Sequence, residues 1–219
     1  MLKRVTLFCG HYGSGKTNIA VNWALHLQKE GHPAAIADLD IVNPYFRTAD
    51  SAPELRDAGV KVVLMPFANS SVDLPSLPSE VYSLVQDKSR YAVFDVGGDD
   101  RGAYALGRYA PAILEEGNYE MLYVVNFLRP LTRNAPDALE VLREIEAAGH
   151  IPFTGIVHNT NLGAETAPED ILEADKKAKE LSALAGIPVA MTTGTKEICD
   201  ALAGRIPALF PITLQAKYY

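Results

Sequence analysis

Eight residues near the start of the chain have the types and the spacing of a phosphate-binding loop. They fit the pattern G-x-x-x-x-G-K-[ST] and read Gly10, His11, Tyr12, Gly13, Ser14, Gly15, Lys16 and Thr17. The glycines allow the backbone to curl so that successive N–H groups point at phosphate oxygens, and a helix beginning here adds the partial positive charge of its N-terminus. We expect Lys16 to bridge the β- and γ-phosphates and the Thr17 hydroxyl to ligate Mg²⁺. Asn18 completes the segment predicted to surround the nucleotide.

Three aspartates follow two apolar runs farther along the chain. Asp38 and Asp40 end one run and Asp95 ends another, so all three are predicted at the carboxyl edge of a parallel sheet, where ligands bind. Asp95 has the form of a carboxylate that holds Mg²⁺ through its water shell, although an ordinary strand-end acid is the alternative. Asp38 and Asp40 point to the same side of a strand, and we favour Asp40 for positioning water. The N–H of Gly97 or Gly98 is a candidate donor to the γ-phosphate. The candidate catalytic residues are therefore Lys16, Asp40 and Asp38, and the candidate Mg²⁺ ligands are Thr17, Asp40 and Asp95.

Apolar runs rich in β-branched residues predict the strands that position these side chains. Seven runs recur about 26 to 35 residues apart, the length of a strand–helix–strand unit, at Val5–Cys9, Ala34–Asp40, Val60–Pro66, Tyr91–Val96, Glu120–Asn126, Thr154–Asn159 and Pro188–Thr193. Between them, helical spacing predicts helices over Thr17–Glu30, Asn134–Ala148 and Pro168–Ala185. The pattern predicts one α/β domain over residues 1–219, with a mostly parallel sheet of about seven strands.

Composition limits the classes of function. The chain has 219 residues and a net charge of −7, without a cluster of lysines or arginines, so binding of nucleic acid through bulk charge is not expected. No apolar run approaches the roughly 18 residues of a membrane span. The two cysteines, Cys9 and Cys199, lie far apart in the sequence and form no C-x-C or C-x-x-C pair. We therefore expect a soluble, cytoplasmic protein.

With these segments, the chain resembles the SIMIBI class of P-loop ATPases, in the MinD/ParA/CobQ-CobB group. The resemblance rests on the phosphate loop, on the D-x-D segment at Asp38–Asp40, and on the segment 94–98, which reads Phe-Asp-Val-Gly-Gly. It implies a three-layer P-loop NTPase sandwich that binds ATP and Mg²⁺. It also implies that Asn159 reads adenine, with residues 192–195 closing the base pocket. A turn asparagine that satisfies its own backbone is the alternative for Asn159.

The chain departs from that group at the start of the loop. MinD and ParA proteins carry a lysine that reaches across a dimer to the partner's nucleotide, whereas this chain has His11 at that position, followed by Tyr12. Catalysis assisted by that lysine is therefore not expected, while a nucleotide-dependent homodimer remains possible. Four arginines follow strand ends near the expected nucleotide, and each is a candidate for stabilising transition-state charge or for surface ion pairing: Arg101, Arg108, Arg129 and Arg133.

These observations predict a Mg²⁺-dependent ATP-binding protein that hydrolyses ATP slowly and acts as a nucleotide switch on a partner protein. Two alternatives stay open. One is an ATP-dependent ligase or kinase of the dethiobiotin synthetase or cobyrinate amidase type, acting on a small carboxylate, with residues 69–79 in its substrate cleft. The other is an adaptor that binds ATP and barely hydrolyses it.

Overall fold

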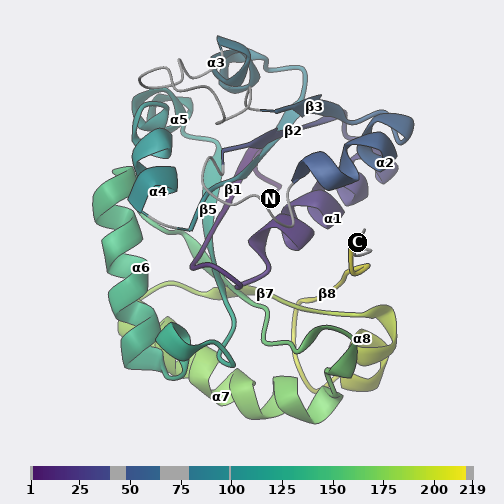
Figure 1. Cartoon of the computed structure of the whole chain (residues 1–219), viewed down its shortest axis with the longest axis vertical. Helices are drawn as coiled ribbons and strands as arrows, with labels where there is room; N and C mark the ends of the chain where they lie inside the picture. The colour runs from purple at the N-terminus through teal and green to yellow at the C-terminus, as the bar shows by residue number, and fades with distance from the viewer. Residues whose placement is uncertain (1, 40–47, 65–78, 99, 216–219) are drawn as a thin grey trace.

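The strands form one open sheet in which β1 lies at the centre. A computed structural model of the chain describes residues 2–39, 48–64, 79–98 and 100–215. The eight strands have the order β3-β2-β4-β1-β5-β6-β7-β8, and every strand pair among these residues is parallel. Helices cover both faces of the sheet (Figure 1). The predicted fold class, a mostly parallel three-layer α/β sandwich, is confirmed.

The strands begin and end close to the predicted limits. They are β1 Val5–Cys9, β2 Ala34–Asp38, β3 Lys61–Val63, β4 Tyr91–Asp95, β5 Tyr119–Val125, β6 Gly155–His158, β7 Val189–Gly194 and β8 Leu209–Pro211. The sheet has one strand more than predicted, β8. This strand was not predicted because it is only three residues long and contains a proline. A proline lacks the N–H of a ladder and is tolerated at a sheet edge, which is where β8 lies. The second strand is shorter than predicted: β2 ends at Asp38, and Asp40 lies outside the described residues.

Eight α-helices and three 3₁₀ turns connect the described strands. The helices are α1 Lys16–Lys29, α2 Ala52–Asp57, α3 Ser79–Gln86, α4 Asp100–Gly107, α5 Ala110–Glu116, α6 Ala135–Gly149, α7 Pro168–Ala185 and α8 Lys196–Leu202, and the 3₁₀ turns are η1 Thr48–Ser51, η2 Pro130–Thr132 and η3 Gly163–Glu165. The predicted helix Pro168–Ala185 has the observed bounds, because a proline at its first position and Gly186 in the left-handed conformation after its end fix both termini. Within the described residues, no helix combines the length and the apolar character needed to cross a membrane.

The two faces of the sheet pack against different helices. On one face, Ile19, Ala20 and Ala24 of α1 pack against Phe8 and against residues of β2 and β4. On the other face, the apolar sides of α3 to α7 pack against the alternate residues of the same strands. Alternation along β1, with Leu7 on one side and Phe8 on the other, therefore sets the orientation of the loop that follows it.

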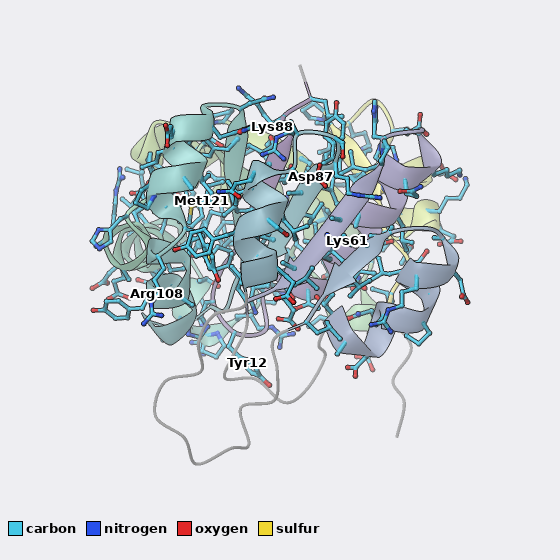
Figure 2. All side chains as sticks on the ribbon, turned by 90° about the horizontal axis from the view of Figure 1, so that it is seen from above. Tyr12, Lys61, Asp87, Lys88, Arg108 and Met121 are labelled. Atoms are coloured by element: carbon cyan, nitrogen blue, oxygen red, sulfur yellow. The ribbon has the colours of Figure 1, made fainter. Side chains whose placement is uncertain are left out.

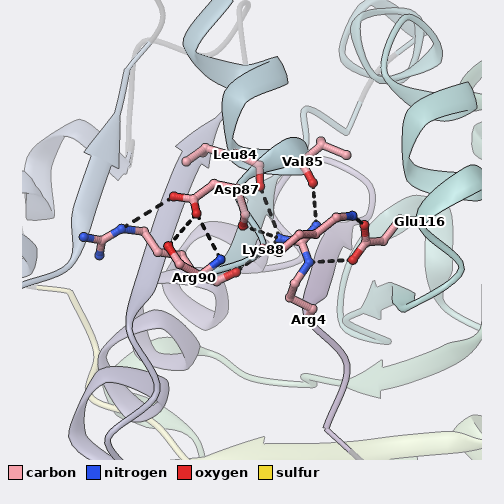
Figure 3. Close-up of polar contacts among 8 residues, drawn as sticks. Arg4, Leu84, Val85, Asp87, Lys88, Arg90 and Glu116 are labelled. Carbon is pink, nitrogen blue, oxygen red and sulfur yellow. Dashed lines mark hydrogen bonds and ion pairs between the residues drawn. The ribbon is translucent and has the colours of Figure 1, made fainter.

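The opposite end of β1 is anchored by Arg4, a buried residue that precedes the strand (Figure 3). Its Nε donates to Glu116 Oε1 at 2.6 Å, and its terminal nitrogens donate to backbone carbonyls at the end of α3, including that of Val85 at 2.6 Å. Lys88 pairs with the other oxygen of Glu116. In Figure 2, Lys88 and Tyr12 lie at opposite ends of the molecule, so this cluster is remote from the phosphate loop. Arg4 therefore joins the start of the central strand to α3 and α5.

Candidate phosphate-binding site

The loop after β1 curls back on itself and ends in α1, as its sequence predicts. Gly13 has φ +77° and Gly15 has φ +89°, backbone conformations that residues with a Cβ rarely adopt. The N–H of Ser14 donates to the carbonyl of His11 at 3.0 Å, which closes the turn. Helix α1 then begins at Lys16 with Gly15 as its N-cap. The loop therefore presents backbone N–H groups and a helix N-terminus at the carboxyl edge of the sheet, the arrangement that binds phosphate.

The side chains of this loop fit a bound phosphate. Lys16 and Thr17 are 5% and 8% exposed, so the loop and helix fix their positions. The Ser14 hydroxyl is buried and has no hydrogen-bond partner among the described residues. A buried hydroxyl of this kind is normally satisfied by a protein group or a bound molecule. Phosphate oxygens held in the loop would supply that partner.

Two of the three predicted aspartates come together beside the loop. Asp38 and Asp95 end adjacent strands and are directly paired in the β2–β4 register, and Asp95 is also paired with Phe8 of β1. The N–H of Leu39 donates to the Asp95 carbonyl at 2.8 Å, which holds the two strand ends together. Both carboxylates are almost fully buried. Parallel pairing of β2, β4 and β1 thus brings these acids to the edge from which the phosphate loop emerges.

A further residue at these acids, Thr48, was not predicted from the sequence. Thr48 is the first residue of η1, and its hydroxyl donates to Asp95 Oδ2 at 3.1 Å. The Thr48 and Asp95 residues are 0% and 1% exposed. The sequence gives no signal for this contact, because Thr48 lies 47 positions from Asp95 and belongs to no recognisable motif.

Gly98 packs directly on the phosphate loop. A Cβ added at this position would lie 2.1 Å from the Gly10 carbonyl oxygen, and a Cβ at Gly10 would lie 2.2 Å from the Val124 carbonyl oxygen. These contacts are between backbones, so side chains cannot move aside to relieve them. The lack of a Cβ at Gly98 therefore lets the segment after β4 touch the start of the phosphate loop, and the lack of a Cβ at Gly10 lets the loop lie against β5.

Replacing Gly98 by alanine is expected to displace the phosphate loop and to weaken nucleotide binding by about 10- to 100-fold, since forcing a methyl group into a packed contact costs about 1–3 kcal/mol. Titration with a fluorescent nucleotide measures this effect. Gly107→Ala is the matched control, because its added methyl group meets no atom closer than 3.5 Å. Equal affinities for the two variants would contradict the prediction.

The side chain of Asn159 holds the phosphate loop to the neighbouring strands. Its Nδ2 donates to the Ser14 carbonyl at 2.6 Å, and its Oδ1 accepts from the Thr193 hydroxyl at 2.6 Å. Asn159 follows β6 and Thr193 lies in β7, so the amide joins three segments that are distant in the sequence. Asn159 is therefore not a turn asparagine satisfying its own backbone. Its amide retains one further N–H and one further lone pair, so recognition of the base stays a prediction.

Arg129, from the loop after β5, contacts the opposite side of the phosphate loop. Its Nε donates to the Gly13 carbonyl at 2.9 Å, and the side chain lies across Gly13. The structure thus places Arg129, one of the four arginines considered from the sequence, on the loop through a hydrogen bond. Its position in the loop after β5 made it a candidate, but the sequence carried no signal for its contact with Gly13.

The remaining predicted site residues differ in their surroundings. The His11 ring lies within 3.1 Å of the Tyr12 carbonyl, and Tyr12 is 60% exposed at the tip of the loop (Figure 2). Asn18 lies in the first turn of α1 and is described below.

His158, beside Asn159, is fully buried, and this burial lowers its pKa to about 4, against a smaller opposing effect of Asp175. His158 is therefore neutral at pH 7 and adds no positive charge beneath the site.

No protein-family model matches the chain, and no curated protein matches it. Solved structures do match. They include chloroplast FtsY from Physcomitrella patens (TM-score 0.61, 18% identity), FtsY from Mycoplasma mycoides (0.59, 16%), and the signal recognition particle receptor FtsY from Elizabethkingia anophelis (0.56, 18%). The E. anophelis receptor is also matched in a complex with GDP (TM-score 0.55, 16% identity).

These matches cover 90–91% of this chain but only 58–62% of each FtsY chain. The chain thus spans about six-tenths of the length of these structures. At 16–18% identity the likeness concerns the fold alone, an open parallel α/β sheet that this chain shares with the FtsY structures. The fold that the resemblance implied is thereby confirmed.

Proposed function

We propose that this protein binds a nucleoside triphosphate and Mg²⁺ at the loop of residues 10–17, hydrolyses the nucleotide slowly, and acts as a nucleotide-dependent switch on a partner protein. The observation that carries the proposal is one juxtaposition. A helix-capping phosphate loop with a buried lysine lies beside two buried carboxylates, Asp38 and Asp95, from adjacent strands. Phosphate, a divalent cation and a positioned water need this set of groups together.

Each group has a role that follows from its chemistry. The loop N–H groups, Ser14 and Lys16 bind phosphate oxygens, and Lys16 neutralises part of their charge. Thr17 supplies a hydroxyl ligand for Mg²⁺, which when bound neutralises charge on the phosphates. Asp95 accepts hydrogen bonds from the water shell of the ion. Asp38 and Asp40 orient the attacking water, with Asp40 assigned by its sequence position alone.

We assign ATP as the preferred nucleotide because the motifs resemble those of the MinD/ParA/CobQ-CobB group. The GDP bound to one FtsY structure is the reason to test guanine nucleotides in parallel. Asn159 is the residue we assign to base recognition, through the N–H and the lone pair that its contacts with Ser14 and Thr193 leave available. A homodimer formed on nucleotide is part of the same proposal.

The proposal is tested by measuring phosphate release from ATP and from GTP, with Mg²⁺ and with EDTA, while molecular mass is followed by light scattering. We expect slow, Mg²⁺-dependent release that favours ATP. Thr17→Val is the matched variant, since it keeps the size of the side chain and removes the hydroxyl. This variant should lose the phosphate release that Mg²⁺ stimulates, while the protein remains folded.

Other outcomes separate the alternatives. Turnover that appears only when a small carboxylate is added would replace the switch by a ligase or kinase. Tight binding of nucleotide without turnover, with or without cell extract, would favour a nucleotide-binding adaptor. Absence of nucleotide binding in the wild-type protein would overturn the proposal.

A further inference from the structure

A segment near the other end of the chain, residues 213–215, lies along the helix that follows the phosphate loop. The side chain of Asn22 in α1 bonds both backbone groups of Thr213: its Nδ2 donates to the Thr213 carbonyl at 2.9 Å, and its Oδ1 accepts from the Thr213 N–H at 2.8 Å. The side-chain amide of Asn22 therefore pairs with the N–H and the C=O of Thr213 in the way that the backbone of a neighbouring strand would. Such a paired contact fixes the direction and the register of the segment.

Two residues farther on, the same segment reaches the first turn of α1. The N–H of Gln215 donates to Asn18 Oδ1 at 3.0 Å. Asn18 directly follows Thr17, the proposed Mg²⁺ ligand. Residue Gln215 is therefore attached to the helix turn that presents Lys16 and Thr17.

The side chain of Gln215 contacts the other side of the site. Its Nε2 donates to Ser51 Oγ at 2.7 Å. Ser51 is the last residue of η1, and Thr48, the first residue of the same turn, donates to Asp95. The short turn η1 is thus held at one end by Gln215 and at the other end by the carboxylate beside the phosphate loop.

We propose that the segment 213–215 positions Thr48 on Asp95 and thereby sets the affinity of the site for Mg²⁺, with Gln215 and Ser51 as the positioning residues. This inference rests on the proposed function. In that function the Asp95 carboxylate accepts hydrogen bonds from the water shell of the ion, whereas in this structure the Thr48 hydroxyl occupies one of its acceptor sites, on Oδ2. An acceptor site that Thr48 occupies is withheld from that water shell. A contact that holds η1 in place therefore favours Thr48 over the ion.

The structure also leaves space for η1 to move. A cavity of about 260 Å³ lies between α1, η1 and the segment 213–215, and Asn22, Ser51 and Gln215 line it. Asp50 and Ser51 of η1 line this cavity, so this end of the turn is not packed against the core and has space in which to shift. Binding of Mg²⁺ with nucleotide should accordingly loosen the contact between Ser51 and Gln215, because the coupling acts in both directions.

The inference is tested with Ser51→Ala and Gln215→Ala in the full chain. With a fluorescent ATP analogue bound, we expect the Mg²⁺ concentration at half-saturation to fall by about 3- to 10-fold in each variant, the effect of removing one neutral hydrogen bond. The double variant should match the single ones, because all three remove the same bond. Ser51→Thr keeps the hydroxyl and should resemble the wild-type protein. Affinity for the analogue in EDTA should stay unchanged.

Trp23 supplies a second readout without any label. It is the single tryptophan of the chain, and its ring packs on Phe210 of β8 at a centroid distance of 5.3 Å. It lies next to Asn22, so its emission reports on the contact between α1 and the C-terminal segment. Addition of Mg²⁺ and ATP should change that emission in the wild-type protein, and this change should be smaller in Gln215→Ala.

The outcomes separate this inference from the proposed function. Wild-type Mg²⁺ dependence in both alanine variants, or a weaker affinity for Mg²⁺, would overturn the positioning role while leaving the proposed function in place. Equal changes with Mg²⁺ and in EDTA would show a general structural effect and would also overturn it. If the wild-type protein binds no nucleotide, the proposed function fails and the positioning role fails with it.

Discussion

Replacement of Lys16 by alanine is expected to weaken the binding of ATP with Mg²⁺ by at least about 100-fold. The motif assigns the ammonium group to the β- and γ-phosphates, and the residue is 5% exposed, so its surroundings restrict its position. A hydrogen bond to a charged group contributes about 1.5–3 kcal/mol, and Lys16 is expected to donate one to each of the β- and γ-phosphates. Isothermal titration calorimetry of the wild-type protein and the variant, with Mg²⁺ present, measures the difference.

Lys29→Ala is the matched control for this substitution. Lys29 is the last residue of the same helix and is exposed, so its loss removes an equal charge far from the loop. The control should bind nucleotide within about twofold of the wild-type protein, because exposed charges at this distance are screened by salt. Retained affinity in Lys16→Ala, with a control that behaves as expected, would show that the loop does not bind triphosphate in the way proposed.

Replacement of Arg4 by alanine is expected to lower the free energy of unfolding by about 3–5 kcal/mol, because it removes the buried donor to Glu116 Oε1 and to several backbone carbonyls at and after the end of α3. The Arg4 side chain donates hydrogen bonds to Glu116 and to four backbone carbonyls, those of Leu84, Val85, Asp87 and Arg90. Lysine cannot replace it, since one ammonium group lacks the planar set of donors that these acceptors need. Urea denaturation followed by circular dichroism provides the measurement.

Lys88→Ala tests whether the loss of stability comes from the buried Arg4 side chain and not from any cation paired with Glu116. Lys88 pairs with the same Glu116, but its side chain is 64% exposed. Its loss should therefore change the free energy of unfolding by less than about 1 kcal/mol. A similar loss of stability in both variants would contradict the role given to Arg4. Nucleotide affinity of the folded Arg4 variant should be retained, since this cluster lies at the end of the molecule opposite Tyr12 (Figure 2).

The core of the site could be predicted from the sequence because its signals are local. The loop 10–17 is a continuous motif, and Asp38 and Asp95 each follow an apolar run. Parallel strands then bring their carboxyl ends to one edge whatever their order, so the acids could be placed near the loop without knowledge of the topology. Strand β8 was missed for the opposite reason. Three residues with a proline carry too little pattern to be recognised, and only pairing with β7 makes them a strand.

The contacts that hold the site in place could not be predicted. Asn159 on Ser14, Arg129 on Gly13 and Thr48 on Asp95 each join residues that are far apart in the sequence. Such contacts depend on the order of strands in the sheet and on the course of each loop, neither of which composition or spacing encodes. The resemblance suggested a role for Asn159 at the base, which stays a prediction, but it gave no indication that the same amide holds the phosphate loop.

The position of β1 in the sheet has a consequence for how the protein is made. Residue Val5 pairs with Ala92 on one side and with Tyr119 on the other, so β1, which is synthesised before both of its neighbours, cannot pair until they emerge from the ribosome. Closing such long loops is slow, and sheets built from distant segments fold slowly for this reason. The phosphate loop is synthesised well before its supports at Asn159 and Thr193. A nascent chain interrupted before these residues would carry the whole motif without the framework that shapes it, so the motif should gain its affinity for nucleotide only late in synthesis.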